Sequence, residues 1–277
     1  MSFRVIFLGT GGGRYSTMYQ VRSTGGMLIQ HDGHNLHVDP GPGALTQMNR
    51  IRYDLTQTES LVISHCHPDH YSDAESVIEG MTKGGWVRRG RVYGSRTVVE
   101  GVGGLGPCLS NYHKNIVSGI DVFEPGDVLD IDGMRVDILR ADHSDPTNVG
   151  FTFHTPHGKV SYVSDTAYSD EIADQYIGSR VVILPVTTPS GNRIKYHMCT
   201  DDAIEFVRRV KPELAVFTHL GVVIIRRGVD DEAAMVMAAT GVRTVAARDL
   251  MTIDVGEEIV LGTKETNEGE WIPDTSP

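Results

Sequence analysis

The sequence predicts an α/β fold made of two related halves, and three observations support this prediction. Short apolar runs recur along the chain and end in polar or glycine-rich segments, as buried strands do. Amphipathic helical stretches lie between several of these runs. Each half also contains a hairpin whose second arm ends in aspartate, at Asp39 and Asp165, and a later strand that ends in histidine, at His65 and His219. Two such halves could direct their polar strand ends toward one functional site.

The apolar runs of the first half predict four short strands and one helix. The glycine-rich loop at residues 9–13 follows the first strand and has unusual backbone freedom. Asp32-Gly33 favours a two-residue turn between the second and third strands. Along the third strand, the side chains of His37 and Asp39 face the same way. We expect the strands over residues 3–8, 28–30, 35–39 and 61–63, and the helix over residues 44–50.

The second half repeats this plan. Pro156-His157-Gly158 predicts a hairpin turn, and Thr200 is expected to cap a helix that Pro212 ends. Gly241 is expected to close the last helix. We expect strands over residues 134–139, 149–153, 159–163, 181–186 and 214–217, and helices over residues 170–176, 201–210 and 232–239.

The two halves are expected to form a single catalytic domain over residues 1–262. Residues 72–127 have no counterpart in the second half and are rich in glycine, so we interpret them as an insertion that could act as a lid. Residues 263–277 are polar and predict a loose C-terminal tail.

Composition excludes several classes of protein. The chain has 277 residues, of which 40% are apolar and 22% charged, which excludes a disordered chain. No apolar run approaches the roughly 20 residues that span a bilayer, and the start does not resemble a signal peptide. Three cysteines cannot all pair, so we expect a reducing, cytoplasmic location. The net charge of −11 disfavours a dedicated nucleic-acid binder, although bound cations would reverse the field locally.

Three imidazoles and a carboxylate lie within six residues, directly after the strand at 61–63. The segment reads His65-Cys66-His67-Pro68-Asp69-His70. Neutral imidazole and carboxylate are natural ligands of zinc and similar divalent ions. On an extended segment the first two histidines point the same way and can bind one ion, while the turn at the proline lets the aspartate and the last histidine face a second. The alternative interpretation is a solvated histidine-rich loop.

This segment matches each defined position of the His-x-His-x-Asp-His motif of the metallo-β-lactamase superfamily, which the chain resembles over residues 3–262. The other landmarks of the family occur in the expected order along the chain. They are an aspartate after the first hairpin, a later histidine, a strand-end aspartate and a final strand-end histidine: Asp39, His143, Asp165 and His219.

The resemblance implies a four-layer αβ/βα sandwich of two mixed β-sheets flanked by helices, with two divalent metal ions. Zinc is expected, with manganese or iron as alternatives. Asp39 is expected to orient a ligand by hydrogen bonding, because ligating histidines need a partner on the other ring nitrogen. The implied ligands are His65, His67 and His143 for the first ion, Asp69, His70 and His219 for the second, and Asp165 between them.

Two ions about 3.5–4 Å apart can share a water whose pKa falls toward neutrality. The resulting hydroxide would attack an electrophilic carbon or phosphorus, while the ions stabilise charge on the substrate oxygens. No side-chain nucleophile is then required. The residues expected to take part in catalysis are Asp69 and His197.

Three stretches favour phosphodiester substrates, because they resemble the ribonuclease Z and cyclic phosphodiesterase branches of the superfamily. These are residues 7–13, 143–151 and 197–203. The branches carry a histidine before a helix, and His197 holds that place here. Its imidazole could contact a phosphate oxygen or give a proton to the leaving group. A solvated surface histidine is the alternative.

The chain departs from ribonuclease Z at two places. Residues 185–189 replace its His-Glu-Ala-Thr segment, and Leu220-Gly221-Val222 follow His219 without the Ser-x-Arg-Tyr ending. We also find no basic arm for tRNA. We therefore prefer a small or cyclic phosphodiester substrate and keep tRNA 3′-end cleavage as an alternative.

The same candidate residues could also serve other functions. They are hydrolysis of a thioester, lactone or amide, iron-based redox chemistry, and a binding module that the metals only stabilise. Assembly as a homodimer also stays open.

Overall fold

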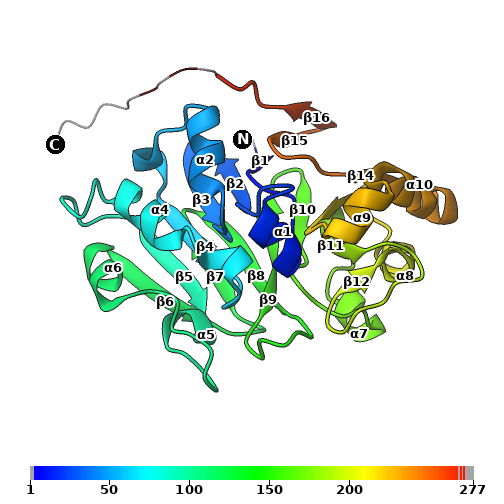
Figure 1. Ribbon diagram of the computed structural model, residues 1–277, viewed down its shortest axis with the longest axis horizontal. Helices are drawn as coiled ribbons and strands as arrows, with labels where there is room; N and C mark the ends of the chain where they lie inside the picture. Colours follow the sequence, from blue (N-terminus) through cyan, green and yellow to red (C-terminus); the bar gives the residue numbers. More distant parts are fainter. Residues whose placement is uncertain (1–2, 268, 270, 272–277) are drawn as a thin grey trace. The chain divides into compact units, whose positions relative to one another are not determined.

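The computed structural model describes residues 3–267, 269 and 271, which form two compact units. Of the described residues, the first unit contains Phe3–Gly9, Arg22–Phe123 and those from Arg248 onward. The second unit contains Thr10–Val21 and Glu124–Ala247. Each unit has its own mixed β-sheet with helices beside it (Figure 1).

The first sheet has the strand order β16-β15-β1-β2-β3-β4-β5-β6. Neighbours from β16 to β3 are antiparallel, and neighbours from β3 to β6 are parallel. The strands are β1 (Phe3–Phe7), β2 (Met27–His31), β3 (His34–Val38), β4 (Ser60–Ile63), β5 (Arg91–Ser95), β6 (Gly119–Phe123), β15 (Met251–Val255) and β16 (Ile259–Thr263). The helices of this unit are α2 (Ala44–Arg50), η1 (Leu55–Gln57), α3 (Pro68–Tyr71), α4 (Ala74–Met81), α5 (Arg96–Val99) and α6 (Asn111–Ile116).

The second sheet has the order β14-β13-β11-β10-β9-β8-β7, with β12 paired to β11. Neighbours from β7 to β10 are antiparallel, and neighbours from β10 to β14 are parallel. The strands are β7 (Val128–Ile131), β8 (Met134–Arg140), β9 (Val149–Thr155), β10 (Gly158–Tyr162), β11 (Ser179–Thr188), β12 (Met198–Cys199), β13 (Leu214–Thr218) and β14 (Arg243–Ala246). The helices are α1 (Gly13–Tyr19), α7 (Asp170–Asp174), α8 (Thr200–Val210), α9 (Val222–Arg227) and α10 (Val229–Thr240).

The repeat predicted from sequence is present in the order of the strands. In both units antiparallel hairpins are followed by three parallel pairings, and the hairpin arms β3 and β10 occupy equivalent places at the change of direction. The histidine-bearing strands are not equivalent. His65 follows β4, the immediate neighbour of β3, whereas His219 follows β13, which lies one strand further from β10. The sequence pattern alone does not reveal this offset.

Residues 72–127, interpreted from sequence as an insertion, supply two strands of the first sheet. β5 and β6 extend the parallel part of that sheet beyond β4. The apolar side chains of α4 are buried with those of β4 and β5 in one cluster that includes Leu61, Val77 and Val92. Much of this stretch is therefore part of the sheet and its core, because β5 forms its backbone hydrogen bonds with β4, and β6 forms its own with β5.

Most predicted elements of the second unit are also present. Helix α8 buries the stripe Ala203, Phe206, Val207 and Val210 against the sheet and ends at Lys211, before Pro212. Its N-cap is Cys199, one residue before the predicted Thr200, and Asp202 accepts the Cys199 backbone N–H. None of the helices in the described part of the chain combines the length and apolar character of a membrane span.

His37 on β3 is fully buried, and its imidazole is neutral in the folded chain. Its Nε2 donates to the carbonyl of Gly25 at 2.9 Å. Burial lowers the pKa of His37 from 6.5 to about 4, against smaller opposing effects of this hydrogen bond and of Asp39. His37 therefore ties β3 to the loop before β2 and has no free charge to offer a ligand.

We expect the folded state to lose stability as the pH falls from about 6.5 toward 4. In this window the unfolded chain protonates His37 and the folded chain does not, which costs about 2 kcal/mol at pH about 5. Urea unfolding of the chelator-treated protein at pH about 7 and about 5 measures this. His37→Asn should be less stable at neutral pH but should show a pH-dependent loss smaller by about 2 kcal/mol. An equal loss in both proteins would contradict the assignment.

Candidate metal centre

Asp39 is the hydrogen-bonding hub of the candidate residues in the first unit. It follows β3 with a φ of 52°, a left-handed conformation that directs its buried carboxylate toward the end of β4. Oδ1 accepts the Ser64 backbone N–H at 2.7 Å, and Oδ2 accepts the Ser64 hydroxyl at 2.8 Å. Oδ2 also accepts Nδ1–H of His70 at 2.9 Å. One carboxylate thus fixes both ends of the histidine-rich segment.

This network determines which nitrogen each imidazole can offer to a metal. The Ser64 hydroxyl has one proton, which it gives to Asp39, so it accepts Nδ1–H of His65 at 2.9 Å. His65 therefore offers Nε2. His70 gives Nδ1–H to Asp39 and likewise offers Nε2. Tautomers fixed in this way are typical of ligating histidines.

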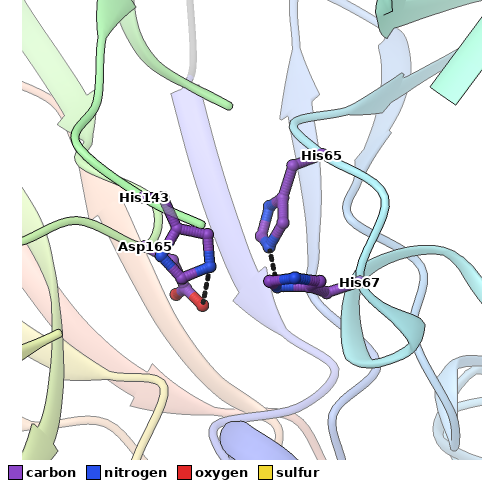
Figure 2. Close-up of side chains that lie close together, drawn as sticks. All are labelled: His65, His67, His143 and Asp165. Atoms are coloured by element: carbon purple, nitrogen blue, oxygen red, sulfur yellow. Dashed lines mark hydrogen bonds and ion pairs between the residues drawn. The ribbon is translucent and has the colours of Figure 1, made fainter. Parts of the chain in front are cut away.

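His65 and His67 direct nitrogens toward one another, as Figure 2 shows. Nε2 of His65 lies 3.0 Å from Nδ1 of His67. Two nitrogens that bind one zinc at 2.0–2.1 Å can be at most about 4 Å apart, so this spacing fits a shared ion. Cys66, between them, is buried in the apolar cluster beside α4.

Helix α3 begins at Pro68 and positions the other two polar residues of the segment. Oδ2 of Asp69 lies 3.9 Å from Nε2 of His70. The loop after Asp39 packs against this helix so closely that a Cβ on Gly41 would lie 1.9 Å from the Asp69 carbonyl oxygen. Glycine is therefore required at position 41, and the sequence analysis did not identify this requirement.

Asp165 is the corresponding hub of the second unit. It follows β10 and is buried. Its Oδ2 lies 3.1 Å from Nε2 of His219 and 3.8 Å from Nε2 of His143, the contact drawn in Figure 2. The same oxygen lies 3.8 Å from Nδ1 of His197. Three imidazoles therefore surround one carboxylate oxygen.

Backbone and neutral side-chain groups orient these residues. His143 gives Nδ1–H to the carbonyl of Tyr196 at 3.2 Å, which leaves Nε2 on the side of Asp165. The buried side chain of Asn148 donates to the Asp165 carbonyl at 2.5 Å, and Ser164 donates to Asn148 at 3.2 Å. The turn before Asp165 is thereby fixed. No local sequence pattern indicates these roles of Asn148 and Tyr196.

His219 is held in place from two sides. Its Nδ1 lies 3.0 Å from the hydroxyl of Thr187 at the end of β11. The backbone of Gly12 covers the ring so closely that a Cβ at that position would lie 2.2 Å from it. The glycine loop singled out by sequence therefore packs against a candidate ligand. His219 itself has a φ of 54°, and such strain is often found at functional sites.

His197 lies among the candidate ligands of the second unit. Ligand atoms of Asp165, His197 and His219 all lie within 4.8 Å of one another. The rings of His197 and His219 are stacked, with centroids 5.5 Å apart. The alternative of a solvated surface histidine is therefore wrong. This group has the donor types that a zinc ion prefers.

The residues predicted from sequence fall into one group in each unit. The first unit brings together Asp39 and the polar residues of the segment from His65 to His70. The second unit brings together Asp165 with three histidines, those at positions 143, 197 and 219. Both groups consist of imidazoles and carboxylates, and several of the imidazoles have one nitrogen engaged by the protein. This donor chemistry fits divalent metal ions.

Comparison with known proteins identifies the family of this chain. A family model described as the beta-lactamase superfamily domain matches residues 34–220. Uncharacterized protein MJ1374 of Methanocaldococcus jannaschii is 36% identical over 250 residues, which cover 90% of this chain and 93% of that protein. Ribonuclease Z of Methanosarcina mazei is 30% identical over 147 residues, which cover 52% of this chain and 46% of that protein.

A solved structure supports the fold. YhfI of Bacillus subtilis, described as a metallo-beta-lactamase fold protein, has a TM-score of 0.78 and 18% identity. The match covers 92% of this chain and 100% of that chain. The predicted fold class, two mixed sheets flanked by helices, is therefore confirmed. The family model and the aligned relatives place the protein in the metallo-β-lactamase superfamily, among relatives of ribonuclease Z.

Proposed function

We propose that the protein is a dinuclear metal-dependent hydrolase that cleaves a small or cyclic phosphodiester. The observation that carries the proposal is that each unit groups a buried carboxylate with several imidazoles, and that the protein holds some of these imidazoles in one tautomer. Such preorganisation costs conformational freedom and leaves buried polar groups, which a purely structural role does not require.

The proposed ligands are those that the family pattern implies. The first unit would contribute one pair, His65 and His67, and a second pair, Asp69 and His70. The second unit would contribute His143, Asp165 and His219. Zinc suits these donors, and manganese or iron are alternatives. Asp39 would act through its hydrogen bonds to Ser64 and His70.

The chemistry divides between the metals and the protein. Bound divalent ions supply Lewis acidity and lower the pKa of water, which suits attack on phosphorus. The protein orients the donors through Asp39 in the first unit and through the Tyr196 carbonyl and the Thr187 hydroxyl in the second, and it buries both Asp39 and Asp165. His197 is the part-buried imidazole beside Asp165, and it can hold a proton for the leaving oxygen of the substrate.

Phosphodiester cleavage is preferred because ribonuclease Z, as its name states, acts on RNA, and RNA is a phosphodiester. A small substrate is preferred over tRNA because the net charge of −11 repels a polyanion.

Hydrolysis of a thioester, lactone or amide is the competing proposal. Metal analysis of protein purified without chelator, followed by assays with bis(p-nitrophenyl) phosphate and p-nitrophenyl acetate, separates the two. Turnover of the acetate alone would reject phosphodiester cleavage.

Replacement of His67 by Ala should lower bound metal and abolish hydrolysis while the fold survives, because the ring supplies a donor 3.0 Å from that of His65. Elemental analysis, circular dichroism and the diester assay measure these three effects. His157→Ala, in the turn between β9 and β10, is the control and should change none of them. Unchanged metal content in His67→Ala would refute the ligand assignment.

Replacement of Asp39 by Asn should weaken metal binding by about 10–100-fold, as loss of a group that orients ligands commonly does. The amide keeps the size of the carboxylate but offers one acceptor oxygen in place of two, so Ser64 and His70 cannot both keep their bonds. Competition with a fluorescent chelator measures the affinity. Wild-type affinity in this variant would show that the network does not support metal binding.

Replacement of His197 by Ala should lower kcat by about 10²–10⁴-fold, the range for loss of a general acid or base. Metal content should stay the same, and one limb of the pH–rate profile should disappear. A parallel loss of metal would instead make His197 a ligand, since it lies within 4.8 Å of the donors of Asp165 and His219.

A further inference from the structure

The segment Lys195-Tyr196-His197 of the second unit adjoins two of the candidate residues: Tyr196 contacts His143, and Nδ1 of His197 lies 3.8 Å from Oδ2 of Asp165. The backbone of Tyr196 has a φ of 66°, a conformation that non-glycine residues rarely adopt. Its carbonyl accepts Nδ1–H of His143, and its ring makes an edge contact with the His143 ring at a centroid distance of 6.1 Å. Tyr196 is thus tied to a candidate ligand through both its backbone and its side chain.

Lys195, the residue before Tyr196, is an exposed cation. Its Nζ lies 4.4 Å from the centroid of the Tyr196 ring, within the range of a cation–π contact. A hydrogen bond to the Tyr196 side chain raises the pKa of Lys195, so the ammonium is charged at neutral pH. In the described part of the chain Lys195 forms no ion pair, and Asp142 acts on it only as a nearby charge.

The neighbouring cation is already engaged. Nη2 of Arg193 lies 2.8 Å from Oδ1 of Asp202 at the start of α8. Lys195 is therefore the cation of this segment that can accept a new anion. The chain has a net charge of −11, and Asp165 is a carboxylate, so both repel an anionic substrate. A nearby cation would offset this repulsion.

We propose that Lys195 binds a non-bridging oxygen of the phosphodiester, and that the segment 195–197 thereby selects anionic diesters over neutral esters, thioesters and lactones. The inference rests on the proposed function and names the chemical class of its substrate. The Lys195 ammonium lies over the Tyr196 ring, and that ring contacts the ring of His143. The ring centroids of His143 and His197 are 5.0 Å apart. A charge-assisted contact from this position stabilises the anion without taking part in bond cleavage.

The experiment compares three variants of the metal-loaded protein. Lys195→Met removes the charge and keeps the length of the side chain, and Lys195→Arg restores the charge. Lys159→Met is the matched control, because Lys159 lies at the start of β10 and Asp165 follows the other end of that strand. Each protein is assayed with bis(p-nitrophenyl) phosphate, and its affinity for inorganic phosphate is measured by titration calorimetry.

Lys195→Met should raise KM for the diester and the dissociation constant for phosphate by about tenfold each, a cautious value for loss of one charged partner at an exposed site. The value of kcat and the metal content should change little. Lys195→Arg should recover most of the affinity, and Lys159→Met should match the wild type. Added salt should raise KM of the wild type more than that of Lys195→Met.

Unchanged KM and unchanged phosphate affinity in Lys195→Met would overturn the inference. A failure of the proposed function would look different, because the metal-loaded wild type would then leave the diester intact. In that case weaker phosphate binding by Lys195→Met would still support an anion site at Lys195, and equal binding would reject it.

Discussion

The candidate site of the first unit depends on the hydrogen bonds that the carboxylate of Asp39 accepts. It accepts hydrogen bonds from the backbone and side chain of Ser64 and from His70, all at distances below 3.0 Å. Through the Ser64 hydroxyl it also determines the tautomer of His65. A buried carboxylate is costly unless its oxygens are paired, so this network both stabilises Asp39 and orients the imidazoles. Loss of Asp39 would remove the acceptor of two buried donors, the Ser64 N–H and the His70 Nδ1–H.

The second unit reaches a similar result with different chemistry. Asp165 stands among three histidines, but neutral groups orient this cluster: the Tyr196 carbonyl, the Thr187 hydroxyl and the Asn148 amide. The ring of His219 is also held by close packing and not by a charged group, because the backbone of Gly12 lies directly against it. The two units therefore share a strand order without sharing the way in which their polar residues are held.

Strand ends explain why these residues gather. Parallel strands place their carboxyl ends at one edge of a sheet. Asp39, the segment from His65 to His70, Asp165 and His219 follow β3, β4, β10 and β13, respectively. Left-handed backbone conformations at Asp39, Ser164 and His219 turn the chain sharply at these ends. Such conformations are strained for residues other than glycine, and the surrounding hydrogen bonds hold them in place.

The sequence by itself determined the strands β1–β4, β8–β11 and β13, the helices α2, α7, α8 and α10, the fold class and the candidate donor residues. These follow from local patterns: buried strands are apolar runs, and imidazoles and carboxylates are recognisable as ligands wherever they occur. Only the tertiary structure showed that β5 and β6 belong to the first sheet and that His219 lies one strand further from its hairpin than His65. It also showed that Gly12, Asn148 and Tyr196 hold the candidate donor residues in place. Strand pairing and close packing join residues far apart in the chain, so no local pattern encodes them.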